Sequence, residues 1–206
     1  MNIRHFNTLY GWKGNKMKAI CACLVIIIFA TPVLGLEIKQ VEGSLKSLPE
    51  TYIEKGACPF ECCRYRTWKV EKDTNIYDKP HGTRAVGKIR KGDLVEGLTG
   101  EVESRPILVT VTADHVDNNG NSFIKGDKFY ILTYRGEGFF KAWFDSKLFD
   151  MDAVGIKDAF EYYSSDPFWA KTSQRYKHVW WKKIKTRQGT IGWTKEDVFS
   201  NQDACG

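Results

Sequence analysis

Short runs in which apolar and polar residues alternate mark candidate strands from residue 67 onward. The first such runs are residues 67–70, 74–77, 85–89 and 94–98, all rich in β-branched and aromatic side chains. Asp, Pro, Gly and a Lys-Gly-Asp tract separate them. Runs that recur about every 8 to 12 residues are typical of a small β-barrel or sandwich. The pattern therefore predicts an all-β fold with little helix.

The same pattern continues through the second half of the chain. It predicts strands at residues 107–112, 128–134 and 139–144, and a further pair of strands near the C-terminus. The residues of the tract 118–120, Asn-Asn-Gly, tolerate positive φ and predict a hairpin or loop. Gln188-Gly189 predicts the turn between the two C-terminal strands, and a one-turn element is expected near residues 195–199.

One segment is a candidate helix. Residues 151–163 could form it, with Asp152 or Asp158 as the N-terminal cap. Asp166-Pro167 would end it, because the residue before a proline is disfavoured in the α conformation.

The N-terminus has the layout of a secretory signal. Lysines precede an apolar stretch at residues 19–30, and Pro32 and the small residue Gly35 follow it. We expect cleavage after Gly35, so that residues 1–35 are a signal peptide and the remainder is exported to a periplasmic or extracellular location. The alternative is an uncleaved membrane anchor at residues 19–36, although Pro32 interrupts the apolar stretch before it reaches a comfortable span.

The charge of the chain is concentrated in this leader. The whole sequence has a formal charge of +6, with 31 basic and 25 acidic side chains. Four of the basic side chains precede residue 36 and no acid occurs before Glu37, so the remainder has a net charge of +2. Such a weak charge does not support a nucleic-acid partner.

Two segments of the chain resemble the bacterial SH3-like module, SH3b. Residues 68–101, "WKVEKDTNIYDKPHGTRAVGKIRKGDLVEGLTGE", are similar to its first half, and residues 180–199, "WWKKIKTRQGTIGWTKEDVF", to its ending. Such modules are small barrels of about 60 residues. The resemblance implies a lead-in segment at 36–63 and an SH3-like domain at 64–206, with 102–179 as an insertion or a second partial barrel.

The resemblance also extends to exported SH3 domain-containing proteins that carry a "CPFECC" leader and have no known chemistry. It implies a non-enzymatic binding module without a cofactor. Its partner would be a peptide, a cell-envelope polymer or another protein, and a membrane would be involved only through an uncleaved N-terminal segment.

The cysteines beyond the leader, Cys58, Cys62, Cys63 and Cys205, could be zinc ligands, a catalytic thiol or disulfides. An oxidising compartment favours disulfides. Adjacent Cys62 and Cys63 point in divergent directions, which disfavours zinc, and no histidine lies in a recognisable catalytic motif. We predict no metal and no catalytic residue, one long bridge from Cys205, and one local bridge, most easily Cys58 with Cys62 or Cys63.

A basic and aromatic run near the C-terminus is the candidate binding segment. No acid occurs from Pro167 to Lys195. Strict alternation puts Trp180 and Ile184 on one face of a strand, whereas the SH3b comparison pairs Trp181 with Ile184 and requires a bulge. In either case one tryptophan is expected to pack inward and the other can be exposed.

This segment has two interpretations, a solvated strand face and a binding face for an anionic polymer or lipid headgroup. The binding hypothesis uses the 73–80 loop and the 180–187 strand. Its candidate residues are Tyr77, Trp180, Trp181, Lys183 and Lys185. Core packing is nevertheless the favoured expectation for five aromatic residues, the candidate Tyr77 among them: Tyr65, Tyr77, Trp143, Trp169 and Trp193.

The sequence therefore favours a non-enzymatic exported SH3-like binding module. One alternative is a thiol-dependent hydrolase or redox protein that uses Cys62 or Cys63. A second alternative is a structural subunit whose surface serves assembly.

Overall fold

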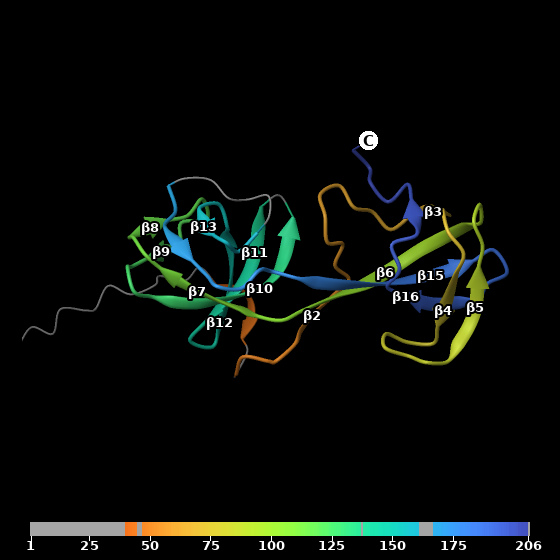
Figure 1. Cartoon of the computed structure of the whole chain (residues 1–206), viewed down its shortest axis with the longest axis horizontal. Helices are drawn as coiled ribbons and strands as arrows, with labels where there is room; N and C mark the ends of the chain where they lie inside the picture. Colours follow the sequence, from red (N-terminus) through yellow and green to blue (C-terminus); the bar gives the residue numbers. More distant parts are fainter. Residues whose placement is uncertain (1–39, 45–46, 137, 161–166, 206) are drawn as a thin grey trace, which may run out of the picture. The chain divides into compact units, whose positions relative to one another are not determined.

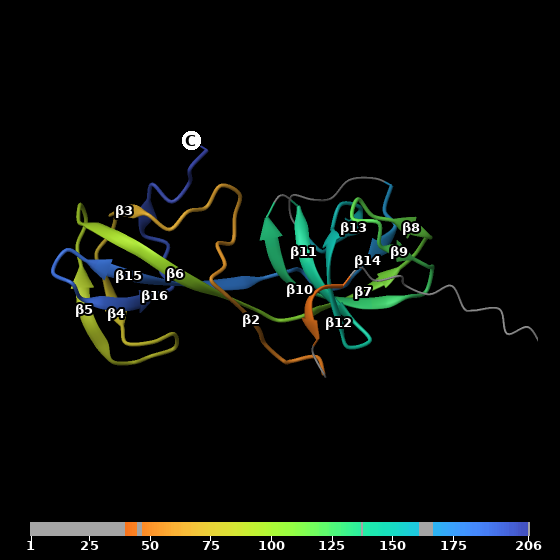
Figure 2. The same cartoon turned by 180° about the vertical axis from the view of Figure 1, so that it is seen from behind.

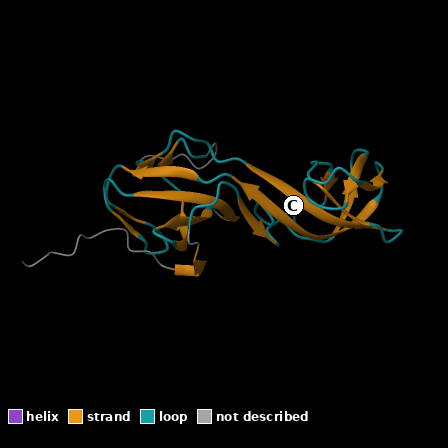
Figure 3. Ribbon diagram, turned by 90° about the horizontal axis from the view of Figure 1, so that it is seen from below, coloured by secondary structure: helices purple, strands orange, loops and turns teal. Residues whose placement is uncertain are grey.

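The structure, a computed structural model, describes residues 40–44, 47–136, 138–160 and 167–205. These residues form strands, turns and loops without any helix, which confirms the predicted all-β fold (Figure 3). Accordingly, nothing in this described part is a helix that could span a membrane. The predicted leader, residues 1–35, and the alternative anchor, residues 19–36, lie outside it.

An eight-stranded sheet combines strands from both ends of the described chain. Its members are β2 (Tyr52–Lys55), β3 (Thr67–Val70), β4 (Thr74–Tyr77), β5 (Ala85–Ile89), β6 (Leu94–Ser104), β15 (His178–Thr186), β16 (Ile191–Thr194) and β17 (Phe199–Ser200). They are ordered β17-β3-β6-β15-β16-β4-β5, and β2 also pairs with β6. Along most of its length β6 lies antiparallel beside β15 (Figure 1, Figure 2).

A seven-stranded sheet is built mainly from the middle of the chain. Its members are β1 (Gln40–Ser44), β7 (Ile107–Val111), β10 (Lys128–Gly136), β11 (Phe139–Phe144), β12 (Lys147–Asp152), β13 (Ile156–Lys157) and β14 (Ala170–Lys171). They are ordered β1-β12-β11-β10-β7-β14-β13. The predicted hairpin at 118–120 joins two further strands, β8 (His115–Val116) and β9 (Ser122–Phe123).

Each sheet has its own apolar core. Trp68 and Ile184 are fully buried in the core of the eight-stranded sheet. Phe129, Phe149 and Trp169 belong to the core of the seven-stranded sheet. Residues 102–179 therefore supply most of a second β-layer with its own packing.

The candidate helix at 151–163 is wrong over the residues that the structure describes. Met151 and Asp152 end β12, and residues 156–157 form β13. Gly155 lies between them with φ of +80°, and a Cβ there would meet the Trp169 ring at 2.8 Å. This close approach turns the chain back toward β14 instead of into a helix. Residues 161–163 lie outside the described part.

Two segments near the ends of the domain also differ from expectation. The lead-in segment contains β1 and β2, which the apolar pattern does not mark. In β2 Tyr52 and Glu54 are half-buried, and Ile53 and Lys55 are exposed, so the central pair inverts the usual arrangement of apolar and charged residues. Residues 195–198 form no turn, and Phe199–Ser200 pair with β3 instead.

Candidate functional site

The two faces of β15 differ in chemistry. Trp180 and Ile184 lie in the apolar core, as strict alternation predicts. Trp181, Lys183 and Lys185 therefore point to the opposite face. The register shift between β15 and β6 occurs because β6 carries the extra residue: Lys183 is opposite Thr99 and Ile184 is opposite Gly97.

On this opposite face one lysine and two aromatic residues form a row across three strands. Lys183 of β15 is opposite Trp193 of β16, and Trp193 is opposite Tyr77 of β4. Residues that are directly opposite in antiparallel strands share a face and contact each other. The Lys183 Nζ lies 5.6 Å from the centroid of the Trp193 ring, and all three side chains are half-buried. We call Tyr77, Trp193 and Lys183 the aromatic row.

The row unites two predicted binding residues and adds one that was assigned to the core. Residues 74–77 form strand β4 as the alternation predicts, so Tyr77 lies in a strand and the loop used by the binding hypothesis begins only at Asp78. Trp193 was expected in the core, yet the fully buried neighbours on its strand are Gly192 and Thr194. The alternation in "TIGWT" could have shown this, because it places Trp193 on the face away from Gly192.

Trp180 is not part of the candidate face, contrary to prediction. It is 8% exposed, and its ring makes edge contacts with Trp68 and Tyr65. Its Nε1 donates a hydrogen bond of 3.2 Å to the Tyr65 hydroxyl. Burial raises the pKa of that hydroxyl to about 12, so Tyr65 remains a neutral partner.

Trp181 lies on the candidate face but is covered. It is 6% exposed, so the expectation of one exposed tryptophan in the pair is wrong. The His81 ring lies 4.9 Å from the Trp181 ring, and the Lys195 Nζ lies 5.8 Å from it. The His81 Nε2 is 2.6 Å from the Glu103 Oε2, which holds the 78–84 loop over the tryptophan.

The fold of that loop depends on a glycine. Arg84 Nε donates to Asp78 Oδ2 at 3.1 Å, and Gly82 N donates to Lys79 O at 3.0 Å. A Cβ on Gly82 would overlap the Asp78 carboxylate and the Lys79 carbonyl. The tight turn therefore requires glycine and delivers His81 to Trp181.

Lys182 is a buried charged residue, although it lies in a basic run of the sequence. It is 2% exposed, and its Nζ donates to the Glu196 carbonyl at 2.9 Å and lies 4.6 Å from the Trp180 ring centroid. Burial lowers the pKa of Lys182 to about 8, although the charges of Asp197 and Glu196 oppose this shift. Its role is to hold the chain after β16.

Lys185, the last candidate on this face, is exposed and paired. Its Nζ lies 3.4 Å from the Glu96 Oε2, and the two residues are directly opposite each other in β15 and β6. The pair is open to solvent, so its lysine can be redirected to a ligand at small cost.

The cysteines are paired as two disulfides, Cys58–Cys63 and Cys62–Cys205. This agrees with the expected combination of one long-range and one local bridge. The Ala204 amide donates to the Cys62 carbonyl at 2.9 Å, so backbone hydrogen bonding brings the C-terminal segment to the cluster. Because Cys62 and Cys63 are both oxidised, neither offers a thiolate to substrate or metal in this state.

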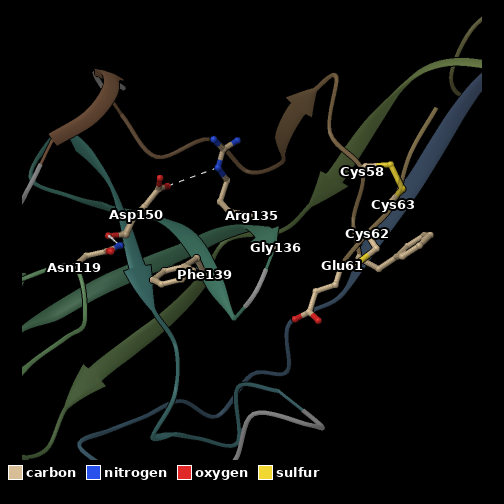
Figure 4. A pocket seen from close by; sticks show the side chains of 10 residues that line it. Cys58, Glu61, Cys62, Cys63, Asn119, Arg135, Gly136, Phe139 and Asp150 are labelled. Atoms are coloured by element: carbon tan, nitrogen blue, oxygen red, sulfur yellow. Dashed lines mark hydrogen bonds and ion pairs between the residues drawn. A yellow bond between two sulfur atoms is a disulfide. The ribbon is translucent and has the colours of Figure 1, made fainter. Parts of the chain in front are cut away.

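A cavity of 540 Å³ adjoins the disulfides (Figure 4). Figure 4 shows Asn119 and Asp150 on one side of it and the sulfur atoms on the other. Arg135 lies between them, and its guanidinium is 2.9 Å from Glu54 Oε1 and 3.7 Å from Asp150 Oδ1. The cation of this cavity is thus already engaged by internal carboxylates.

The other two described histidines stack on aromatic rings away from the cysteines. The His115 ring lies 4.3 Å from the Trp169 ring, and burial lowers the pKa of His115. The His178 ring lies 5.6 Å from the Tyr176 ring, and burial, followed by the charge of Lys182, lowers the pKa of His178. Both rings therefore favour the neutral state and a packing role.

Compared with protein-family models, with curated proteins and with solved structures, the chain gives no significant match.

Proposed function

We propose that the protein is a non-enzymatic exported module that binds a peptide, a cell-envelope polymer or a protein partner through the face that carries the aromatic row. The observation that carries this proposal is the alignment of Tyr77, Trp193 and Lys183 across three adjacent strands on the face opposite the core. Two rings and one ammonium group on neighbouring strands offer both apolar contact and a charged donor.

The surroundings of the row extend this surface. Ile191 is exposed on the same face of β16, two residues from Trp193. Lys185 is opposite Ile191 and belongs to an exchangeable surface ion pair. An extended chain could therefore lie across β15 and β16, with its apolar groups on the rings and its carbonyl or carboxylate groups on the lysines.

The resemblance to the SH3b module gives further support. The segments that carry it, residues 68–101 and 180–199, supply most of the strands of one sheet. The aromatic row contains residues of both segments, so a binding face built on it requires both halves of the module to be folded. Two disulfides fit a protein of an oxidising compartment.

A fluorescence titration tests the proposal. The protein would be titrated with solubilised cell-wall fragments and with a panel of unstructured peptides while its tryptophan emission is recorded. We expect a saturable change with at least one probe, and a loss of affinity of about tenfold or more in Trp193→Ala, as for an aromatic anchor. Trp143→Phe, a half-buried tryptophan on the other sheet, is the matched control and should bind normally.

Two results would reject the proposal. One is the absence of any response or pull-down with all probes. The other is equal affinity in Trp193→Ala and in the unmodified protein.

The two alternatives find less support. A thiol-dependent enzyme would need Cys62 or Cys63 in reduced form, and both are in disulfides. An assembly subunit would need a contiguous exposed apolar patch, but the large exposed apolar residues in the described part of 102–179 lie on separate elements: Val116 in β8, Val154 in a turn and Val179 in β15.

A further inference from the structure

Two tight turns meet at one end of the eight-stranded sheet. The first, residues 90–93, joins β5 to β6, and the second, residues 186–189, joins β15 to β16 (Figure 1). Thr186 is directly opposite Val95 in the β6–β15 ladder, so the two turns lie side by side. Gly92 and Gly189 have φ of +91° and +87°, and these positive values let the chain reverse direction within a few residues at each turn.

A cavity of 530 Å³ lies between these turns, and we call it the turn cavity. Arg90 lines it from the first turn, and Arg187 from the second. Buried Ile89 and Val95 also contribute to its wall. A second hollow of 370 Å³ shares Arg187 with the turn cavity and continues toward Lys185.

Each carboxylate near the two hollows has a partner: Asp93 and Asp73 near the turn cavity, and Glu96, which lines the second hollow and pairs with Lys185. Asp93, which also lines the cavity, accepts a hydrogen bond of 2.8 Å from the Arg90 backbone amide. Asp73 accepts one of 2.9 Å from the Lys91 amide and pairs with the Lys88 Nζ at 3.3 Å. These contacts, led by the backbone amide, lower the pKa of Asp73, so its charge is kept and already neutralised.

The two arginines, in contrast, are exposed and make no direct contact with a carboxylate of the described part, although the charge of Arg90 also helps to lower the pKa of Asp73. Neither the Arg90 nor the Arg187 guanidinium makes a hydrogen bond or an ion pair with any residue of the described part. Two guanidinium groups that line one hollow repel each other, and an anion between them would relieve this repulsion. Their planar donor sets match oxyanions in bidentate geometry.

We propose that the turn cavity binds a phosphoryl group of an anionic chain, held from two sides by Arg90 and Arg187. A phosphoryl group offers several acceptor oxygens and up to two negative charges, so it can satisfy two guanidinium groups that approach from different turns. The adjoining hollow gives the next anionic group of the chain access to Lys185. Arg90 and Arg187 lie outside the aromatic row, so this site does not depend on the row, although Lys185 borders both surfaces.

Calorimetric titration at fixed ionic strength tests this proposal with three probes: inorganic phosphate, tripolyphosphate and poly-L-glutamate. We expect tripolyphosphate to bind more tightly than phosphate, and poly-L-glutamate to bind most weakly. Arg90→Gln combined with Arg187→Gln should weaken tripolyphosphate binding by about tenfold or more, because charge-assisted hydrogen bonds are lost on both sides. Arg90→Lys combined with Arg187→Lys should recover only part of the affinity, since lysine lacks the planar fork.

The controls separate this site from general charge and from the proposed binding face. Arg105→Gln removes an exposed arginine elsewhere and should leave the affinity unchanged. Trp193→Ala should also bind tripolyphosphate normally, so a failure of either proposal leaves the other intact. Thermal melting should match for the arginine variants, because Arg90, Arg187 and Arg105 are exposed.

Three outcomes would overturn the inference. Equal tripolyphosphate affinity in the Arg90→Gln/Arg187→Gln variant would remove the two arginines from the site. Equally tight, equally arginine-dependent binding of poly-L-glutamate would reject the preference for phosphoryl groups. Inorganic phosphate binding as tightly as tripolyphosphate would reject a chain as the ligand.

Discussion

The two sheets each bury one lysine, and they compensate its charge in different ways. In the seven-stranded sheet, Lys141 is 4% exposed and its Nζ lies 3.2 Å from both carboxylate oxygens of Glu54. In the eight-stranded sheet, Lys182 meets backbone carbonyl oxygens and the Trp180 ring. A carboxylate contacts the first charge directly, whereas the second is contacted by carbonyl oxygens and a ring, and the charges of Asp197 and Glu196 act on it without direct contact. Burial therefore lowers the pKa of Lys182 despite these charges.

This difference indicates what each lysine contributes. Glu54 belongs to β2, a strand of the eight-stranded sheet, so its pair with Lys141 joins the two sheets. Lys182 instead fixes the carbonyls of Lys195 and Glu196, and Lys195 in turn covers Trp181. The Glu54–Lys141 pair thus connects the two sheets, and Lys182 positions the segment that covers Trp181 on the candidate binding face.

The largest expected effect concerns the covalent tie of the eight-stranded sheet. Cys62→Ser with Cys205→Ser opens a bridge that spans 143 residues, and should lower the free energy of unfolding by about 5 kcal/mol in the chain-entropy model. The matched control, Cys58→Ser with Cys63→Ser, opens a bridge that spans 5 residues and should cost about 2 kcal/mol. Guanidinium denaturation without reductant measures both. Equal losses would show that loop length does not govern the stabilisation.

The next effect is the loss of stability when buried Lys141 loses its carboxylate partner. Glu54→Gln removes the carboxylate that buried Lys141 shares with Arg135, and should cost about 3 kcal/mol in denaturant unfolding. Glu54→Leu with Lys141→Met removes both charges and should recover most of that loss. Glu50→Gln, at an exposed glutamate, is the control and should leave the unfolding midpoint unchanged. A Glu54→Gln variant as stable as the control would mean that the pair does not hold the sheets.

A smaller effect appears as a pH dependence of Lys182. Its folded-state pKa of about 8 lies below its ordinary value of 10.5, so the unfolded chain binds more protons between these values. The cost of burying the charge is complete below pH 8 and is lost as the pH rises. Stability should therefore increase by about 2 kcal/mol from pH 8 to pH 10.

The window of this pH effect can be isolated. The pKa of Tyr65 is raised from 10.0 to about 12, so it reduces stability only above pH 10. Lys182→Met should flatten the slope of unfolding free energy between pH 8 and pH 10, whereas Lys183→Met, one residue along β15, should preserve it. A slope that persists in Lys182→Met would assign it to another group.

Much of the eight-stranded sheet could be predicted because its strands alternate cleanly. Strict alternation put Trp180 and Ile184 on one face of a strand, and the structure has both in the same core, but spacing alone left open whether Trp180 or Trp181 packs inward. The sequence predicted one long and one local disulfide but not which cysteines pair, because Cys62 and Cys205 are brought together by long-range contacts such as the hydrogen bond from the Ala204 amide to the Cys62 carbonyl. Such a contact joins residues far apart in sequence, and local pattern does not encode it.

The failures occur where a charged or polar residue is buried. Glu54 points inward in β2 while Ile53 is 48% exposed, which inverts the pattern that marks a strand. Lys182 was counted in a basic run although it faces the core, and Trp181 is covered by His81 from a distant loop. In each case a partner supplied by another element changes the expected burial.

The smallest expected effect compares the buried ion pair with an exposed one. Lys185 and Glu96 are opposite each other and 3.4 Å apart, but both are open to solvent. A double-mutant cycle with Lys185→Met and Glu96→Gln should give a coupling of about 0.2 to 1 kcal/mol that falls as salt is added. The same cycle at Glu54 and Lys141 should give a larger coupling that salt changes little. Similar coupling energies at both sites would mean that solvent does not weaken the Lys185–Glu96 ion pair. Lys185 would then be held by Glu96 and would not be available to a ligand.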